Sequence, residues 1–446
     1  MKPILEIPPE PEIKLLRPFL AFAANKTSGG ILLLACTVVA LVWANSPWAA
    51  TYSQLWHTNL TLSLAGRGLS HDLHFWVNDL LMAVFFFVVG LEIKREIQVG
   101  ELASVRQATL PILAALGGVA VPALIYFSLN YAGPGAAGWG IPMATDIAFA
   151  LGVMAMLGDR VPLGLKVFLT ALAIVDDIAA VVVIAVFYTS EIDWMSVGLA
   201  GVVIGVLFAA NRLGVRHPLP YALLGAVLWF AVLQSGIHAT IAGVALAFTI
   251  PARSTLEPAD FLRRCRAILN YFERAAQSEK SIMNDVEQHS SIEALETACE
   301  RVHSPLHRME HALHSWVTFL IMPVFALANA GVVLGGNFAE SFSRPVTFGV
   351  FLGLLIGKPI GIMLASWLAV RSGVASLPAG VNWNHVHGAG WLGGIGFTMS
   401  LFVTGLAFPQ EDLADMAKLG ILIASVCAGL IGSALLILNR RSATVS

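Results

Sequence analysis

Two adjacent aspartates, Asp176 and Asp177, lie inside the apolar segment Leu163 to Phe187. A carboxylate at bilayer depth costs about 2.5–3.5 kcal/mol on insertion scales, so an intramembrane acid usually has a function. Two more charged residues, Asp146 and Lys358, lie in other apolar segments. Protons and hard cations compete for the same carboxylate oxygens. These residues therefore predict an ion-exchange site within a membrane.

The alternative is that the aspartates mark a break, with Asp177 capping a helix outside the membrane. Each apolar flank of the pair is shorter than the roughly 20 residues that a spanning helix needs. Only the joined segment is long enough, which favours a pair inside the bilayer.

The composition is typical of an all-α polytopic membrane protein. Of the 446 residues, 57% are hydrophobic and 12% are charged, and the mean hydropathy is +0.77. The net charge of -2 indicates no nucleic-acid partner, the four cysteines lack the spacing of a zinc site, and neither a cofactor nor an enzymatic activity is expected. Hydropathy predicts about twelve spans, centred near Cys36, Val84, Ala120, Phe149, Ile174, Ile204, Leu228, Val244, Pro323, Ile356, Gly396 and Ala428.

The distribution of lysine and arginine places both termini in the cytoplasm. Of 26 such residues, only Arg67, Arg344 and Lys418 fall in expected outer loops, and Lys358 falls in a span. The loop 251–314 is polar, and it could form one or two amphipathic helices on the membrane surface, or a solvated linker. The expected order is a cytoplasmic tail (1–28), spans one to eight (29–250), the cytoplasmic loop (251–314), spans nine to twelve (315–438) and a second tail (439–446).

Spans four and eleven carry helix-breaking residues near their centres. Span four has glycine and proline between 138 and 142 and then Thr145 and Asp146, while span eleven is glycine-rich from Gly388 to Gly396. Unwound backbone persists at membrane depth only where protein or a cavity surrounds it. Each is the middle span of three, in groups that begin on opposite sides of the membrane, which predicts inverted repeats with a binding site at the breaks.

Asp146 and Lys358 fit such a site. Asp146 is placed to offset the positive ends of half-helices or to act as a plain N-cap, and the two roles are compatible. Lys358 lies among glycines 353, 357 and 361, whose spacing suits close helix packing. A buried lysine there needs a carboxylate partner, unless it snorkels to an interface.

Eight motifs follow one another along the chain: FFFVVGLEIKREIQVGEL (85–102), GIPMATDIAFALG (140–152), ALAIVDDIA (171–179), GIHATIAG (236–243), SPLHRMEHALHSW (304–316), FALANAGV (325–332), GKPIG (357–361) and GGIGFTMS (393–400). In this order they closely resemble the signatures of bacterial NhaA-type sodium/proton antiporters. The rule that links paired broken spans to a binding site was derived partly from this family, so the two arguments are not independent.

The resemblance implies an electrogenic, pH-regulated antiporter for sodium or lithium in the bacterial inner membrane, as a homodimer. It implies about twelve helices with inverted repeats, and crossing, discontinuous spans four and eleven that contain Thr145 and Asp146. It further implies that Asp177 binds the cation, and that Asp176 pairs with Lys358, takes part in proton exchange and completes the sodium or lithium site.

The resemblance also assigns a pH response to a cytoplasmic group and to one histidine near the outer side. By position alone, the charged residues at the end of span two could be ordinary surface ion pairs; they are Glu92, Lys94, Arg95 and Glu96. The histidines at 303, 307 and 311 favour a solvated or titrating helix face over a metal site. Residues 262–290 are inserted relative to the simplest family pattern, and Asp79 matches an acid of span two. The implied pH-responsive residues are Glu92, Arg95, Glu96, Glu310, His311, His314 and, near the outer side, His238.

Two other classes of protein use buried acids. An intramembrane aspartyl protease would need Asp146 and Asp177 as a dyad, but no Gly-x-Gly-Asp motif occurs. A cation channel needs acids but no inverted pair of broken helices. Cation-driven proton release in sealed vesicles would separate an antiporter from both.

Overall fold

The computed structural model describes residues 28–64, 67–189, 191–253, 257–275, 286–302, 304–333 and 338–439. Almost all of the two expected tails, 1–28 and 439–446, lies outside these residues. The described part is all-α apart from one antiparallel hairpin of β1 (Asn59–Leu64) and β2 (Arg67–Asp72), in which Asn59 faces Asp72. The predicted fold class, an all-α polytopic membrane protein, is confirmed.

Eleven of the twelve predicted span centres fall within apolar helical segments of the described residues, and the twelfth, Gly396, lies in the break between α19 (Trp383–Gly393) and α20 (Phe397–Ala407). Eight segments are long and apolar enough to cross a membrane, and two bent pairs of helices qualify if each pair counts as one span. Two shorter apolar helices, α10 (Pro218–Gln234) and α11 (Thr240–Thr249), cover the remaining two centres. The eight are Leu73–Val99, Val105–Asn130, Ala136–Leu157, Leu163–Phe187, Trp194–Arg212, Pro305–Asn329, Pro345–Arg371 and Glu411–Leu438, and the bent pairs are Ser28–Ala44 with Ala49–Trp56 and Trp383–Gly393 with Phe397–Ala407.

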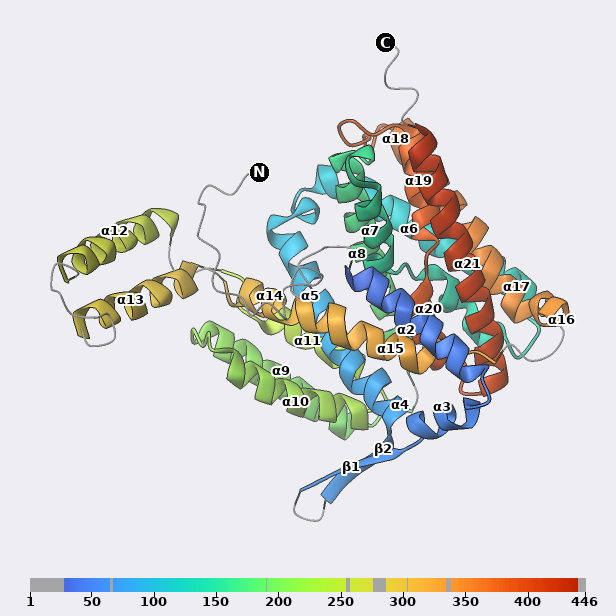
Figure 1. Ribbon diagram of the computed structural model, residues 1–446, viewed down its shortest axis with the longest axis horizontal. Helices are drawn as coiled ribbons and strands as arrows, with labels where there is room; N and C mark the ends of the chain where they lie inside the picture. The colour runs from blue at the N-terminus through green and yellow to red at the C-terminus, as the bar shows by residue number, and fades with distance from the viewer. Residues whose placement is uncertain are drawn as a thin grey trace, which may run out of the picture. The chain divides into compact units, whose positions relative to one another are not determined.

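The chain forms two compact units, and the first comprises the described parts of 1–74, 106–180 and 318–446. In it α21 packs along both α17 and α19, and α15 packs against α2 (Figure 1). Its helices are α2 (Ser28–Ala44), α3 (Ala49–Trp56), α6 (Val105–Asn130), α7 (Ile147–Leu157), α8 (Leu163–Phe187, to residue 180), α15 (Met322–Asn329), α16 (Phe338–Ser343), α17 (Pro345–Leu352), α18 (Lys358–Arg371), α19 (Trp383–Gly393), α20 (Phe397–Ala407) and α21 (Glu411–Leu438).

Glycines on α18 and in the π turn before it allow the close helix packing that their spacing predicts. A Cβ atom on Gly361 would lie 2.1 Å from the carbonyl oxygen of Gly117 on α6, and one on Gly357 would lie 2.9 Å from Cα of Pro122. Between α17 and α18 the helix widens into a π turn, Gly353–Gly357, just before Pro359, which has no N–H to donate. This packing brings Lys358 into the interior, where its side chain is fully buried.

The second unit comprises the described parts of 75–105 and 181–317. Its α5 packs closely on α11, and Gly243 makes this close approach possible: a Cβ atom there would lie only 2.1 Å from the carbonyl oxygen of Ala83. The expected cytoplasmic loop, 251–314, contains two helices, α12 and α13, that lie side by side, and it also contains most of α14 (Figure 1). The unit contains a π turn (Trp76–Leu81) that follows the short α4 (Leu73–Phe75), then α5 (Met82–Val99), α9 (Trp194–Arg212), α10, α11, α12 (Pro258–Ala275), α13 (Val286–Val302) and α14 (Pro305–Trp316).

Candidate ion-exchange site

The breaks in spans four and eleven meet inside the first unit. Span four has a 3-10 segment (Ala136–Met143), extended residues 144–146 and then α7. Span eleven bends by 44° between α19 and α20. The backbone N–H of Asp146 donates to the carbonyl of Ile395 at 2.7 Å, and the Ser400 hydroxyl donates to the carbonyl of Ile141 at 2.9 Å. The predicted unwinding of both spans is confirmed, and the two breaks satisfy each other's backbone groups.

Asp146 holds the N-termini of two half-helices. Its Oδ1 accepts the backbone N–H of Phe149 at 2.9 Å, which makes it the N-cap of α7. Its Oδ2 accepts both the backbone N–H (3.1 Å) and the hydroxyl of Thr398, at the start of α20. The positive ends of both helix dipoles therefore lie against one buried carboxylate. Asp146 therefore has the geometry of both predicted roles, an N-cap and a charge that offsets helix dipoles.

Asp176, Lys358 and Thr145 form a second buried group. The Lys358 ammonium donates to Oδ2 of Asp176, and the Thr145 hydroxyl lies 2.6 Å from the same oxygen. That hydroxyl also lies 2.8 Å from the carbonyl of Gly393, at the end of α19. Within the described residues, Oδ1 of Asp176 accepts no hydrogen bond. In an ion pair this deeply buried, each charge depends on the other, because the loss of either partner would leave an uncompensated charge in the protein interior.

Asp177 follows Asp176 on α8. Neighbouring residues of a helix point about 100° apart, so its carboxylate is directed differently from the one that binds Lys358. Thr145, Asp146, Asp176, Asp177 and Lys358 are each at most 2% exposed. The structure therefore collects three carboxylates and one ammonium group in the interior of one unit. If all are ionised the set is short of positive charge, which suits the binding of a cation.

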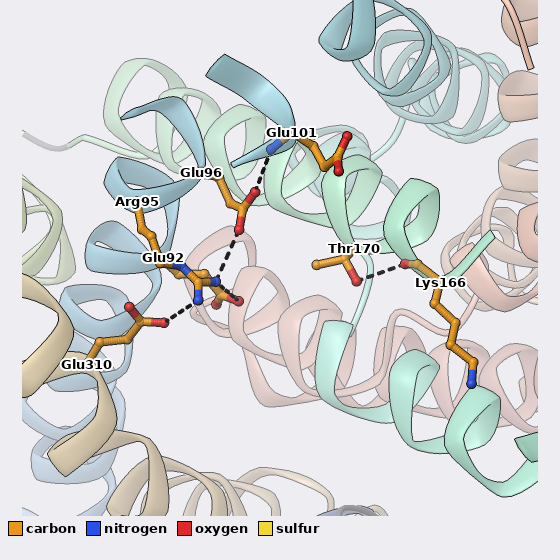
Figure 2. A network of polar contacts seen from close by, with 7 residues as sticks. All are labelled: Glu92, Arg95, Glu96, Glu101, Lys166, Thr170 and Glu310. Carbon is orange, nitrogen blue, oxygen red and sulfur yellow. Dashed lines mark hydrogen bonds and ion pairs between the residues drawn. The ribbon is translucent and has the colours of Figure 1, made fainter. Parts of the chain in front are cut away.

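In the second unit, Arg95 of α5 gathers three glutamates (Figure 2). Its guanidinium lies 3.1 Å from Glu96, 3.3 Å from Glu310 of α14 and 3.8 Å from Glu92. Glu96 also accepts the backbone N–H of Glu101 at 3.1 Å. Glu96 and Glu310 are only 16% and 14% exposed, so this is a half-buried network rather than a set of surface ion pairs. One cation among three acids leaves an excess of negative charge that protons can neutralise.

The structure does not bring the other expected pH-responsive residues into this network. His311 and His314 are exposed on α14, and His311 stacks on His307 with ring centroids 6.4 Å apart. His238 precedes α11, where burial lowers its pKa. Asp79 lies in the π turn before α5, about 20 Å along the helix from Glu92. No group of three or more His, Cys, Asp or Glu residues in the described chain could hold a metal ion; His303 lies outside it.

Sequence reasoning missed three polar residues that support these sites. Thr398 binds Asp146, and Ser425 of α21 accepts the backbone N–H of Phe397 at 3.2 Å. The only sequence signal for Thr398 is its position just after the glycine-rich segment of span eleven. Ser425 lies on another helix, and its sequence position gives no such signal. Lys94 was grouped with the surface charges of span two, yet it is 8% exposed and donates to backbone carbonyls.

The chain is similar over nearly its whole length to known transporters. The family described as Na+/H+ antiporter 1 matches residues 20–436. The Na(+)/H(+) antiporter NhaA of Koribacter versatilis is 52% identical over 429 residues, which are 96% of this chain and 92% of that protein. The protein of the same name from Oleidesulfovibrio alaskensis is 53% identical over 421 residues, 94% of each chain. The one from Acidithiobacillus ferrooxidans is 49% identical over 420 residues, 94% of this chain and 96% of that protein.

Proposed function

The chain belongs to the Na+/H+ antiporter 1 family, whose relatives here are NhaA antiporters, and from this premise we propose that it exports sodium in exchange for external protons. It is a multi-pass membrane protein. We place it in the bacterial inner membrane with both termini in the cytoplasm, as the distribution of basic residues indicates. Its action is transport, with no covalent change in the substrate.

The observation that carries the proposal is the buried Asp176–Lys358 ion pair, one residue from Asp177, at the place where two broken helices meet. We assign Asp177 as the principal ligand of the cation. In the proton-loaded form it is protonated, and Asp176 holds the ammonium group of Lys358. A sodium ion that arrives from the cytoplasm takes the Asp177 oxygens, and the proton leaves to the cytoplasm.

Asp176 supplies the second step. Its Oδ1 is open to the cation, and as Oδ2 turns from Lys358 toward sodium, the lysine loses its partner. A buried ammonium group without a partner gives up its proton. Two protons then leave for each sodium ion bound, and the reverse occurs after the site opens outward. One net positive charge enters the cell per cycle, so the exchange is electrogenic.

Thr145 and Asp146 support this chemistry without being exchanged. The Thr145 hydroxyl joins the Asp176 oxygen to the carbonyl at the end of α19, so a change at the ion pair reaches the span-eleven break. Asp146 keeps two positive helix ends together. Lithium is the expected second substrate, because it is a small, hard cation that prefers oxygen ligands.

We further propose that the Arg95 network makes exchange depend on pH. Three acids around one guanidinium carry an excess of negative charge, and proton uptake by the network removes their repulsion. Proton release tightens the contacts around Arg95. The exposed His311 and His314 and the half-buried His238 are the histidines of this unit that the family resemblance links to the pH response. A homodimer is the expected assembly, by family membership.

Inside-out membrane vesicles provide the test. A proton gradient is built by respiration and followed with a pH-sensitive dye, and then sodium, lithium or potassium is added. We expect sodium and lithium to collapse the gradient between pH 7 and 9, whereas vesicles without the protein should not respond. Indifference to both ions over this range would defeat the proposal. A cation channel would let sodium enter without coupled proton release, and a protease would do neither.

A further inference from the structure

The C-terminal end of α11 is bound by three other helices of its unit. The last four carbonyls of a helix have no partner within it and must find one elsewhere. Lys94 of α5 donates to the carbonyls of Phe248 (2.6 Å) and Ile250 (2.5 Å). Asn211 of α9 donates to the carbonyl of Thr249 at 2.6 Å.

The next carbonyl joins a third helix to the same place. The backbone N–H of Leu306, in the first turn of α14, donates to Pro251 at 3.2 Å. Carbonyls 248–251 thus receive donors from α5, α9 and α14, and we call them the α11 junction. A cation is also well placed here, because the C-terminus of a helix carries about half a negative charge.

Lys94 and Arg95 connect the α11 junction to the Arg95 network. These consecutive residues of α5 bind different neighbours: Lys94 holds the end of α11, and Arg95 holds Glu310 of α14. Glu310 lies one helical turn from Leu306, the residue that donates to the α11 junction. The α5–α14 register that sets the Arg95–Glu310 contact is therefore also fixed through the end of α11.

The charged groups around Lys94 come from two helices. Glu92, Arg95 and Glu96 flank it on α5, and α14 contributes Glu310 together with Arg308 and three histidines, 307, 311 and 314. Residues 240–249 of α11 include no acid or base, and α9 ends with Asn211 and the exposed Arg212. Despite the glutamates beside it in sequence, Lys94 forms no ion pair with a described residue; both of its hydrogen bonds go to carbonyls.

We propose that Lys94 is a positioning residue for the pH response: it clamps the α11 junction, so that the glutamates around Arg95 are held at one spacing. This deepens the proposed function and rests on its pH dependence. Without the clamp, α14 is free to shift against α5, and one positive charge near the glutamates is lost. A shift of α14 weakens the Arg95–Glu310 contact. The loss of this contact and of the Lys94 charge disfavours the ionised form of the network, so a more alkaline solution is needed to reach half-maximal exchange.

The test compares Lys94→Gln, Lys94→Arg and the wild type in inside-out vesicles from pH 6.5 to 9. We expect Lys94→Gln to move half-maximal exchange by about half a pH unit or more to the alkaline side, a change of about threefold in proton concentration. Lys94→Arg should restore the profile in large part, because it keeps the charge and the donors. The matched control is Lys166→Gln, since the ammonium of Lys166 also donates to a helix-end carbonyl, that of Gly158 at 3.2 Å.

A second measurement separates this inference from the transport proposal. Amide hydrogen exchange of the purified protein should become faster in residues 246–252 and 305–311 of Lys94→Gln, and not in Lys166→Gln. This holds whether or not the protein exchanges sodium. An exchange rate reduced equally at all pH values would make Lys94 merely structural and overturn the proposal. Unchanged amide protection at the α11 junction would overturn it as well.

Discussion

Asp176 and Asp177 are neighbours of the same residue type and similar burial, and we assign them different roles because their surroundings differ. Asp176 is already engaged, with Lys358 and Thr145 on one oxygen. The assignment of the cation to Asp177 rests on this asymmetry and on family membership. It is open to a direct mutational test.

Asp177→Asn should abolish sodium-driven proton release. The amide removes the negative charge and cannot carry the exchanged proton, and loss of even an outer-shell partner of a metal ion costs about 10–100-fold, so at least about 100-fold is expected here. The measurement is dye-reported exchange in inside-out vesicles at pH 8.5. Asp193→Asn is the control, because Asp193 is an exposed N-cap of α9. Full activity of Asp177→Asn would reassign the cation ligand.

Removal of Lys358 should damage the fold more than removal of the whole ion pair. Lys358→Met leaves the Asp176 carboxylate buried beside an apolar side chain, which costs about 3–5 kcal/mol. In the double variant Asp176→Asn/Lys358→Met no charge is left unpaired, and most of that loss should return. Thermal unfolding in detergent, without sodium, gives the comparison. A double variant no more stable than Lys358→Met would show that the pair is not energetically coupled.

Glycines that bring helices together are the main stabilising device at the scale of elements. Gly243→Ala should destabilise the protein by about 1–3 kcal/mol, because its Cβ would meet the backbone of Ala83 and Phe87, which cannot move aside. Gly205→Ala on α9 is the matched control. Nothing lies within 4 Å of its Cβ, and alanine is the better helix former. Thermal unfolding of both variants checks this, and equal losses would contradict it.

The elements also show what sequence can and cannot predict. The breaks of spans four and eleven were predictable because glycine and proline act locally on the backbone. The Asp176–Lys358 contact joins residues 182 apart, and the Thr398–Asp146 bond joins residues 252 apart. Burial only requires that a charge have a partner. Its identity follows from how helices pack, so the first pairing was reached through resemblance and the second was missed.

At the scale of the whole molecule, the two units hold different kinds of charge. The carboxylates and the lysine of the exchange site are buried in the first, while the second has the half-buried Arg95 network and His238 before α11. The sequence predicted that all of these charged residues belong to a membrane protein, but it did not predict which of them lie in which unit. That division depends on contacts between distant segments of the chain. It places the proposed exchange residues and the proposed pH-responsive residues in different units.

Stability should fall in mildly acidic solution, in part through His238. Its ordinary pKa is about 6.5, and burial lowers the pKa in the folded protein. Between these two values the unfolded chain binds more protons, so stability is fully present above about pH 6.5 and declines as pH falls through the folded pKa. His238→Gln should flatten this decline, whereas His57→Gln, at an exposed position, should not. Melting temperatures from pH 5 to 8 in potassium buffer, which avoids stabilisation by bound sodium, give the comparison. Parallel curves for wild type and His238→Gln would remove this histidine from the pH dependence of folding.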